Sequence, residues 1–332
     1  MDDSKAENEG MVDVLVVGAG IAGLLAATRL TEGGLKVRVL EKSRGYGGRM
    51  ATRRMGEAVF DYGAQYFTVR TPTFAAHVER WVSDGLIREW FRKFPNEESS
   101  TGHPRYIGIS GMTTVPKALA AALDIELESK VEAAYWTGSS WRLRLAGGAE
   151  RQGRFLFLST PVPQAVEILR AGGGDLMESG RMDEAIGIRY ERSLTAMVLF
   201  DQASEVGGFG GMKSGHPDLS WIADNHLKGI SPVPGSITIH SSYDFGKEFW
   251  DADPKAWSAR LIEAAREVCP GEVVEVRPHR WGYNIPVNPL EDTVFLKRRE
   301  HLVLAGDGFG GPRVEGSAVS GIDAAERLLD II

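Results

Sequence analysis

The sequence predicts an α/β protein with two interleaved domains, one built on a mainly parallel sheet and one, of α+β type, on a mainly antiparallel sheet. Residues 12–41 read as a strand, a glycine-rich turn, a helix and a second strand. Residues 301–329 give the order strand, glycine-rich turn and helix again near the other end of the sequence. Between them, residues 172–292 contain several strand-like runs and few helical ones. This order of elements indicates a discontinuous α/β domain that shares the chain with a second, strand-rich domain.

The first strand is predicted at residues 14–17, a valine and leucine run typical of a strand buried on both faces. Gly18, Gly20 and Gly23 follow with G-x-G-x-x-G spacing. In this pattern the first glycine permits a sharp turn, the second lets the backbone approach a pyrophosphate, and the third lets the helix pack against the sheet. The helix, predicted at residues 21–31, directs its free N–H groups and positive dipole end at the phosphate.

The next strand is predicted at residues 36–40 and ends at Glu41. An acid at this position accepts hydrogen bonds from ribose hydroxyls, and its charge repels a 2′-phosphate. Glycines with this spacing are far more specific between a strand and a helix, with such an acid following, than they are alone. The pattern predicts an adenine dinucleotide site and leaves NAD and FAD open; a glycine turn in another α/β unit is the alternative.

Composition excludes several classes of protein. The 332 residues suffice for two domains, and 43% hydrophobic with 25% charged residues is ordinary for a globular protein. A net charge of -7 argues against a nucleic-acid partner, which normally needs a basic face. Cys269 is the only cysteine, so no internal disulfide forms, and the seven histidines show no metal-ligand spacing. We therefore expect neither a metal site nor a nucleic-acid interface.

The localisation predicted from the sequence is cytoplasmic. Residues 1–10 are polar and acidic and lack the basic segment of a secretory signal. Apolar runs are short and interrupted by glycines, so none reaches the length of a membrane span. We expect a soluble protein without a membrane partner.

A basic, glycine-rich loop follows the second strand at residues 42–54. It begins where the ribose should lie, and its glycines permit close backbone approach to a ligand. An arginine beside a pyrophosphate forms strong charge-assisted hydrogen bonds. We predict that Arg49 contacts a phosphate or the ribityl chain; a solvated basic loop is the alternative.

The remaining elements follow from hydrophobic periodicity and turn residues. Helices are predicted at residues 74–84, 111–123 and 253–268, with another beginning at residue 164. Strands are predicted at residues 60–67, 125–127, 155–158, 196–200, 219–223, 236–240 and 273–281, with a hairpin of residues 135–145 and 150–157 around Gly147-Gly148.

The C-terminal segment is predicted to form a second part of the cofactor site. A strand at residues 301–305 leads into Gly306 and Asp307, and a helix follows at residues 317–329. FAD is longer than NAD, because its pyrophosphate continues into a ribityl chain and a flavin. Asp307 is suited to hold ribityl hydroxyls, and the helix start at residues 316–320 to stabilise the charge of the reduced flavin. The two ends of the sequence together favour FAD.

With these features, the chain resembles the flavin-dependent amine-oxidase superfamily through GAGIAG, Glu41, GGR at 47–49 and AGDGF at 305–309. It resembles the renalase-like group more narrowly through GAQYFT at 63–68, STPVP at 159–163, IHSSYDFG at 239–246 and HRW at 279–281. The resemblance implies a discontinuous Rossmann-like (GR2-type) FAD-binding domain at residues 11–72, 105–170 and 293–332. It implies an interleaved substrate domain at residues 73–104 and 171–292.

The glycine pattern and the resemblance together give a set of residues expected to bind FAD. They are Gly18, Gly20, Ala22, Gly23, Glu41, Lys42, Gly48, Arg49, Ala64, Gln65, Tyr66, Val131, Thr160, Gly306, Asp307, Glu315, Gly316 and Ala318. Non-covalent FAD is expected, because no cysteine or histidine stands in an attachment motif. His240, Arg280 and Asn284 are candidate substrate contacts near strand ends of the second domain, with a purely structural histidine as the alternative reading of His240.

The resemblance implies an oxidase that takes hydride from isomeric (2- or 6-) dihydro-NAD(P) to flavin N5, after which O2 reoxidises the flavin and forms hydrogen peroxide. No protein base is needed for this step, because the dihydropyridine nitrogen supplies the electron push. The expected partners are thus a small-molecule substrate, a dihydronicotinamide dinucleotide or an amine, and O2. Two alternatives stay open: an amine oxidase or desaturase-like oxidase of the same superfamily, and a flavin-binding protein without turnover.

Overall fold

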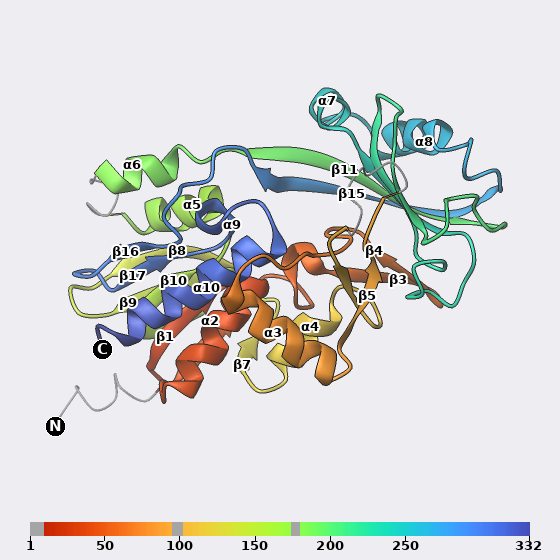
Figure 1. Ribbon diagram of the computed structural model, residues 1–332. Helices are drawn as coiled ribbons and strands as arrows, with labels where there is room; N and C mark the ends of the chain where they lie inside the picture. Colours follow the sequence, from red (N-terminus) through yellow and green to blue (C-terminus); the bar gives the residue numbers. More distant parts are fainter. Residues whose placement is uncertain (1–9, 95–101, 174–179) are drawn as a thin grey trace. The chain divides into compact units, whose positions relative to one another are not determined.

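The computed structural model describes residues 10–94, 102–173 and 180–332 (Figure 1). The chain divides into two compact units. The first unit comprises residues 1–48, 116–189 and 286–332, and the second comprises residues 49–115 and 190–285. The second unit therefore includes residues 49–72 and 105–115, which the sequence analysis assigned to the FAD-binding domain, and the first includes 171–189 and 286–292, assigned to the substrate domain.

The first unit is built on an eight-stranded sheet with a parallel centre. The sheet order β16-β17-β10-β1-β2-β7 is formed by Phe295–Lys297, Leu302–Leu304, Glu150–Leu158, Val12–Val17, Val37–Leu40 and Asp124–Glu126. The antiparallel strands β8 (Val131–Trp136) and β9 (Trp141–Leu145) extend it through a hairpin of β9 and β10. The predicted α/β class and the parallel sheet are confirmed.

Two long helices pack against each other in the first unit, α2 (Ile21–Glu32) and α10 (Val314–Leu329), which run side by side in Figure 1. A Cβ on Gly321 would collide with the backbone of Ala22, so the glycine permits this close approach. Arg29 and Glu326 add an ion pair at 2.5 Å between Nε and Oε1. The shorter helices of this unit are α4 (Thr114–Ala120), which begins in the second unit, α5 (Val162–Gly172), α6 (Gly180–Ile186) and α9 (Asp307–Gly310).

The prediction of one strand over residues 135–145 is wrong. Strand β8 ends at Trp136 and β9 begins at Trp141, with a turn between them. Gly138 has a φ of 95°, and the Thr137 N–H donates to the Ser140 carbonyl at 2.9 Å. The glycine and serines of this turn favour a reversal more strongly than the flanking apolar residues favour a continuous strand.

The second unit contains a five-stranded sheet with mainly antiparallel pairing, as predicted. Its order β12-β13-β14-β11-β15 is formed by Gly211–Lys213, Leu219–Asp224, Ser236–Ser241, Tyr190–Phe200 and Val273–Pro286. Two hairpins complete the strands, β3 (Thr52–Met55) with β4 (Ala58–Asp61), and β5 (Ile87–Phe91) with β6 (Arg105–Gly108). The helices are α3 (Pro72–Ser83), α7 (Tyr243–Glu248) and α8 (Pro254–Ala264), with a short 3-10 turn at Gly48–Met50.

Helix α8 supplies the apolar cover of this sheet. Trp257 and Leu261 are buried in one cluster with Ile237 and Ile239 of β14 and with Cys269. The helix ends at Ala264, four residues before the predicted end. The predicted strand over residues 60–67 ends at Asp61, because the following backbone and side chains form hydrogen bonds outside a ladder.

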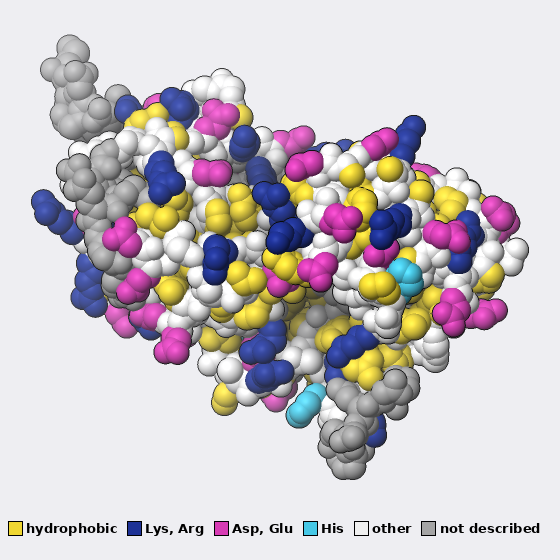
Figure 2. Space-filling model, turned by 90° about the horizontal axis from the view of Figure 1, so that it is seen from above, with side chains coloured by type: hydrophobic (Ala, Val, Ile, Leu, Met, Phe, Trp, Pro, Cys, Tyr) yellow, Lys and Arg dark blue, Asp and Glu magenta, His cyan; other side chains and the backbone are white. Residues whose placement is uncertain are grey.

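Charges of both signs are interspersed on the face drawn in Figure 2. Helices of the described residues are all too short or too polar to cross a bilayer. Within the same residues, no group of three or more histidine, cysteine, aspartate or glutamate side chains is arranged to hold a metal ion.

Candidate functional site

The turn between β1 and α2 has the geometry that a dinucleotide requires. Gly18 has a φ of 105°, in a region that favours glycine. A Cβ on Gly23 would collide with the carbonyl oxygen of Gly18, so this glycine brings the helix close to the strand end. A Cβ on Gly20, by contrast, would meet nothing within 4 Å. The space in front of Gly20 is therefore open, where the second glycine of the pattern approaches a pyrophosphate.

The first unit also offers unused donors around this space. Gly20 is the N-cap of α2 and no side chain caps the helix, so N–H groups of its first turn are available to an anion. Thr160 Oγ1 is buried and has no hydrogen-bond partner among the described residues. The Thr160 side chain lies beside Gly18, with its Cγ2 3.5 Å from the position of an added Cβ. A buried hydroxyl without a partner beside an open glycine turn fits a bound polar ligand.

The basic loop lies next to the glycine turn. The Gly47 N–H donates to the Ala19 carbonyl at 2.8 Å, and an added Cβ on Gly48 would lie 3.7 Å from the Cα of Gly20. Glycines of both the turn and the basic loop therefore border the open space, so a ligand could approach the backbone of either segment. The residues of the first unit fit the pyrophosphate of a dinucleotide.

Glu41 connects the two segments through its carboxylate. Oε2 accepts a hydrogen bond from the Ala19 N–H and Oε1 accepts one from the Ser43 N–H, both at 2.8 Å. The residue is only 7% exposed. Each carboxylate oxygen has a further lone pair for a ribose hydroxyl. Glu41 thus stabilises the loops themselves, a role that the sequence analysis did not include.

We expect Glu41→Ala to weaken FAD binding by about 1.5–3 kcal/mol, the scale of a hydrogen bond to a charged group. Isothermal titration of the apoprotein with FAD measures the change. Glu32→Ala is the matched control, because Glu32 is an exposed glutamate at the far end of α2. Full affinity in the Glu41 variant would contradict the proposed ribose contact.

The C-terminal segment brings its predicted residues to one place. Gly306 has a φ of 130° and its N–H donates to Ser320 Oγ at 2.8 Å, which fixes the chain as it enters α9. Asp307 is the first residue of α9 and is 6% exposed. A Cβ on Gly316 would collide with the Gly310 carbonyl, so Gly316 lets α10 pack against α9.

Helix α10 begins at Val314, three residues before the predicted start. Glu315 and Gly316 are therefore in its first turn, and Ala318 is fully buried one turn further on. The other predicted residues of this unit are scattered. Lys42 is exposed and its Nζ lies 3.4 Å from Gln164 Oε1, and Val131 is the buried first residue of β8. Their contacts with FAD stay predictions.

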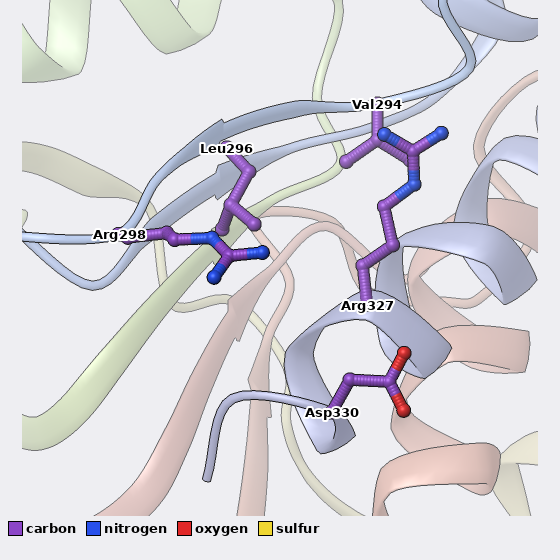
Figure 3. A pocket seen from close by; sticks show the side chains of 5 residues that line it. All are labelled: Val294, Leu296, Arg298, Arg327 and Asp330. Carbon is purple, nitrogen blue, oxygen red and sulfur yellow. The ribbon is translucent and has the colours of Figure 1, made fainter.

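A surface hollow in the first unit, drawn in Figure 3, is not this site. Val294, Leu296, Arg298, Arg327 and Asp330 line it. Arg327 and Asp330 stand at the C-terminal end of α10, whereas Glu315 and Gly316 are at its beginning. At a rise of 1.5 Å per residue, the two ends are separated by roughly 18 Å. Arg327 also pairs with Asp292 at 3.3 Å.

In the second unit, the structure brings three predicted residues together. Arg49 Nη1 donates to the backbone carbonyl of Asn284 at 3.0 Å, and its guanidinium carbon lies 6.0 Å from the centre of the Tyr190 ring. The Ala64 N–H donates to the Arg49 carbonyl at 2.8 Å. Arg49, Ala64 and Asn284 therefore form one connected group in this unit.

A second connected group contains Gln65 and His240, at 3.0 Å between their Nε2 atoms. Two residues outside the predicted set complete it: Lys228 Nζ lies 2.8 Å from Asp61 Oδ2 and 3.4 Å from Gln65 Oε1. The Lys228 and Asp61 side chains are both 0% exposed. Burial lowers the pKa of Lys228, and the charge of Asp61 opposes that effect. The sequence does not predict a buried Lys228, because a lysine in a polar turn is normally expected to be exposed to solvent.

Arg280 donates hydrogen bonds to two backbone carbonyls of its own unit. Its Nε donates to the Trp250 carbonyl at 2.8 Å, and its Nη2 donates to the Ala252 carbonyl at 2.5 Å. The guanidinium therefore connects β15 with the segment between α7 and α8. Its neighbour Trp281 stacks on Tyr62 with 5.1 Å between ring centres. A substrate contact for Arg280 stays a prediction without support from these bonds.

Two histidines of the second unit should make it sensitive to acid. Burial lowers the pKa of His240 to about 4, with a smaller contribution from Lys228, and burial together with Arg53 lowers that of His279 to about 4. The unfolded chain, with ordinary histidine pKa values, takes up protons first as the pH falls. Stability is therefore complete above pH 6.5 and is lost progressively toward pH 4.

For His240 alone, we expect a loss on the order of 2–3 kcal/mol in the free energy of unfolding between pH 7 and pH 4.5. Urea denaturation at both pH values measures it. His240→Gln should remove a large part of the dependence, whereas the same change at the exposed His216 should not. An equal pH dependence in the wild type and in His240→Gln would rule out this assignment.

Comparisons with known proteins relate the chain to flavoproteins. Residues 16–83 match the family model described as an NAD(P)-binding Rossmann-like domain. An FAD-binding monooxygenase of Hypomyces subiculosus is 24% identical over 272 residues, 79% of this chain and 41% of that protein. The flavin-dependent L-tryptophan oxidase of Lentzea aerocolonigenes is 41% identical over 95 residues, 29% of this chain and 20% of that protein. The chain thus spans less than half the length of these curated relatives.

Among solved structures, the cyclohexylamine oxidase of Brevibacterium oxydans IH-35A superposes with a TM-score of 0.72. The match covers 96% of this chain and 99% of that one at 14% identity. At this identity the likeness shows the fold alone: a Rossmann-like sheet with a separate antiparallel sheet. The sequence and structural matches together relate the chain to FAD-dependent oxidoreductases with an amine-oxidase-like fold.

Proposed function

We propose that this chain, which has the fold of the amine-oxidase-like flavoproteins, is an FAD-dependent oxidase that removes hydride from a carbon next to nitrogen in a small molecule. The observation that carries the proposal is the open space at Gly20, in front of an uncapped helix start. The Thr160 side chain, whose hydroxyl has no partner among the described residues, lies beside Gly18 of the same turn. When bound, FAD would accept the hydride and pass the electrons to O2. The residues that would hold it are the Gly18–Gly23 turn, Glu41 and Asp307.

Non-covalent binding of FAD is part of the proposal. Cys269, the only cysteine, is buried in the apolar cluster under α8, and burial raises the pKa of its thiol to about 12. A thiol with so high a pKa is a poor nucleophile for flavin attachment. Precipitation of the protein with acid should therefore release all of the yellow colour into the supernatant.

Two observations bear on the substrate. The names of the relatives and the structural neighbour include an L-tryptophan oxidase and a cyclohexylamine oxidase, and both names specify oxidation of a nitrogen compound. These names favour an amine as the first substrate class to test. A desaturase-like oxidase of the same superfamily is the other form of this alternative. The blocks at 63–68, 159–163 and 239–246 favour a second candidate, the renalase-like oxidation of isomeric dihydro-NAD(P).

An anaerobic titration of the yellow protein with each class of reductant distinguishes these candidates. We expect the flavin absorbance to bleach rapidly with one class, either primary and cyclic amines or the 2- and 6-dihydro isomers of NAD(P), and peroxide to form stoichiometrically when air is admitted. β-NADH serves as the control for unspecific reduction. Peroxide production no greater than that of free FAD with every reductant would favour a flavin-binding protein without turnover and would contradict the oxidase proposal.

A further inference from the structure

Asp61, Gln65, Lys228 and His240 form a hydrogen-bonded polar group in which each atom can act in only one role, as donor or as acceptor. Lys228 can only donate, and its Nζ lies 2.8 Å from Asp61 Oδ2 and 3.4 Å from Gln65 Oε1. The backbone carbonyl of Asp61 can only accept, and it lies 2.7 Å from Gln65 Nε2. A flipped amide would place donor against donor and acceptor against acceptor. Gln65 is therefore held in one orientation from both sides.

This orientation determines which imidazole nitrogen of His240 carries the proton. Gln65 Nε2 is a donor, and it lies 3.0 Å from His240 Nε2, which must then accept. The proton of the neutral ring accordingly lies on Nδ1, which donates to Thr195 Oγ1 at 2.9 Å. A second proton on Nε2 would face the Gln65 amide N–H groups, so this contact opposes the imidazolium.

The charges around His240 act in the same direction. The charge of Lys228 acts on His240, and Asp61, fully buried with Lys228, neutralises that charge in part. Arg88 approaches from β5, where its Nη2 donates to the Lys228 carbonyl. The neighbouring strands β11 and β13 present Thr195 and Trp221 opposite His240 in the ladder, and neither titrates as an acid near neutral pH. No carboxylate bonds directly to the ring in the described part of the chain.

We propose that Gln65, oriented by Lys228 and the carbonyl of Asp61, is a positioning residue that fixes His240 as the neutral Nδ1–H tautomer. Both ring nitrogens are then engaged inside the second unit, and the ring offers no free electron pair to accept a proton. The tautomer itself is independent of the proposed oxidase function. Its chemical consequence rests on that function: His240 does not act as a general base in substrate oxidation, which suits a substrate whose own nitrogen supplies the electron pair, such as a neutral amine or a dihydropyridine.

Nitrogen-15 NMR of the full chain with labelled histidine tests the tautomer directly. Two other histidines act as internal references. His226 Nδ1 lies 3.0 Å from the Ser231 carbonyl and must carry a proton, whereas His216 Nδ1 accepts from the Asp218 N–H at 3.1 Å, so its proton lies on Nε2. We expect His240 to give the pattern of His226 at pH 7. The pattern of His216 at this position would overturn the proposal.

Gln65→Met removes the amide while keeping a side chain of similar length, and Gln202→Met is the control at an exposed glutamine of the same unit. In Gln65→Met the His240 signals should shift toward a mixture of both tautomers, while those of His226 and His216 stay unchanged. Gln65→Glu offers an acceptor to Nε2 and should raise the pKa of His240. An unaltered His240 spectrum in both folded variants would show that Gln65 does not set the tautomer.

A kinetic readout separates this proposal from the proposed function. Should the protein oxidise a substrate, the rate constant of flavin reduction in the wild type should lack an ionisation of His240 between pH 5.5 and 8, and Gln65→Glu should introduce one. Should no substrate reduce the flavin, the NMR result still decides the tautomer. A wild-type rate that falls with a histidine pKa near 6.5 and loses this dependence in His240→Gln would contradict the positioning role.

Discussion

Gly20→Val should give a folded protein that cannot bind FAD. The added side chain would project into the open space in front of α2, where an extra Cβ meets nothing within 4 Å. Gly20 has φ -76° and ψ 175°, an extended conformation that valine adopts without strain. The fold should therefore tolerate the change, whereas the pyrophosphate loses its place against the backbone. We expect at least a hundredfold loss of FAD affinity, roughly 3 kcal/mol.

Two other glycines serve as controls for this variant. Gly45→Val lies in the neighbouring basic loop and also meets nothing within 4 Å, so flavin binding should be retained. Gly23→Val should instead prevent folding, because a Cβ at this position would collide with the Gly18 carbonyl. Absorbance at the flavin band and circular dichroism distinguish the three outcomes. Full flavin occupancy in folded Gly20→Val would refute the site.

Lys228→Met should cause a large loss of stability in a protein that still folds. The ammonium and the carboxylate of Asp61 are both fully buried and lie 2.8 Å apart. Removing one partner leaves an uncompensated charge in the interior, which typically costs about 3–5 kcal/mol. Asp61 Oδ1 also accepts from Thr52 Oγ1 at 2.6 Å and from the Met112 N–H at 2.8 Å, so the carboxylate cannot turn toward solvent. Denaturant unfolding measures the difference.

The double variant Asp61→Asn with Lys228→Met tests whether the loss comes from the stranded charge. An asparagine Oδ1 can still accept from Thr52 and Met112, so we expect at least half of the lost stability to return. Arg277→Met is the surface control, because its ion pair with Glu275 is solvent-exposed and should contribute about 1 kcal/mol or less. A loss in Lys228→Met no larger than in Arg277→Met would contradict a buried charge pair.

Local patterns in the sequence predicted the strands and the helix around the glycine turn well. The helix predicted at residues 21–31 is α2, Ile21–Glu32, and the strands on either side of it are β1 and β2. Each of these elements is specified by residues near in sequence: apolar runs, a glycine turn and a terminating Gly-Gly pair. The prediction of one long strand over residues 135–145 is wrong. A turn at Gly138, which is also a local feature of the sequence, divides it into two strands.

The compact units could not be placed from the sequence with the same accuracy. Residues 49–72 follow the segments predicted to bind the cofactor directly in the chain, and yet they belong to the second unit. The contacts that put them there are distant in sequence: the Asp61 N–H donates to Asn225 Oδ1 at 3.1 Å, and Thr238 Oγ1 donates to the Asp61 carbonyl at 3.0 Å. Periodicity carries no information about such pairs.

The sequence by itself determined the glycine turn, the acid at position 41 and the second glycine–aspartate segment, because each of these is fixed by backbone conformation over a few neighbouring residues. Only the tertiary structure decided that Lys228 and Asp61 are buried together, that Gln65 has one orientation and that His240 has one tautomer. Burial and hydrogen-bond direction depend on groups more than 160 residues apart in the chain, as with Asp61 and Lys228. The proposed cofactor site follows from local geometry, and the polar interior of the second unit follows from long-range packing.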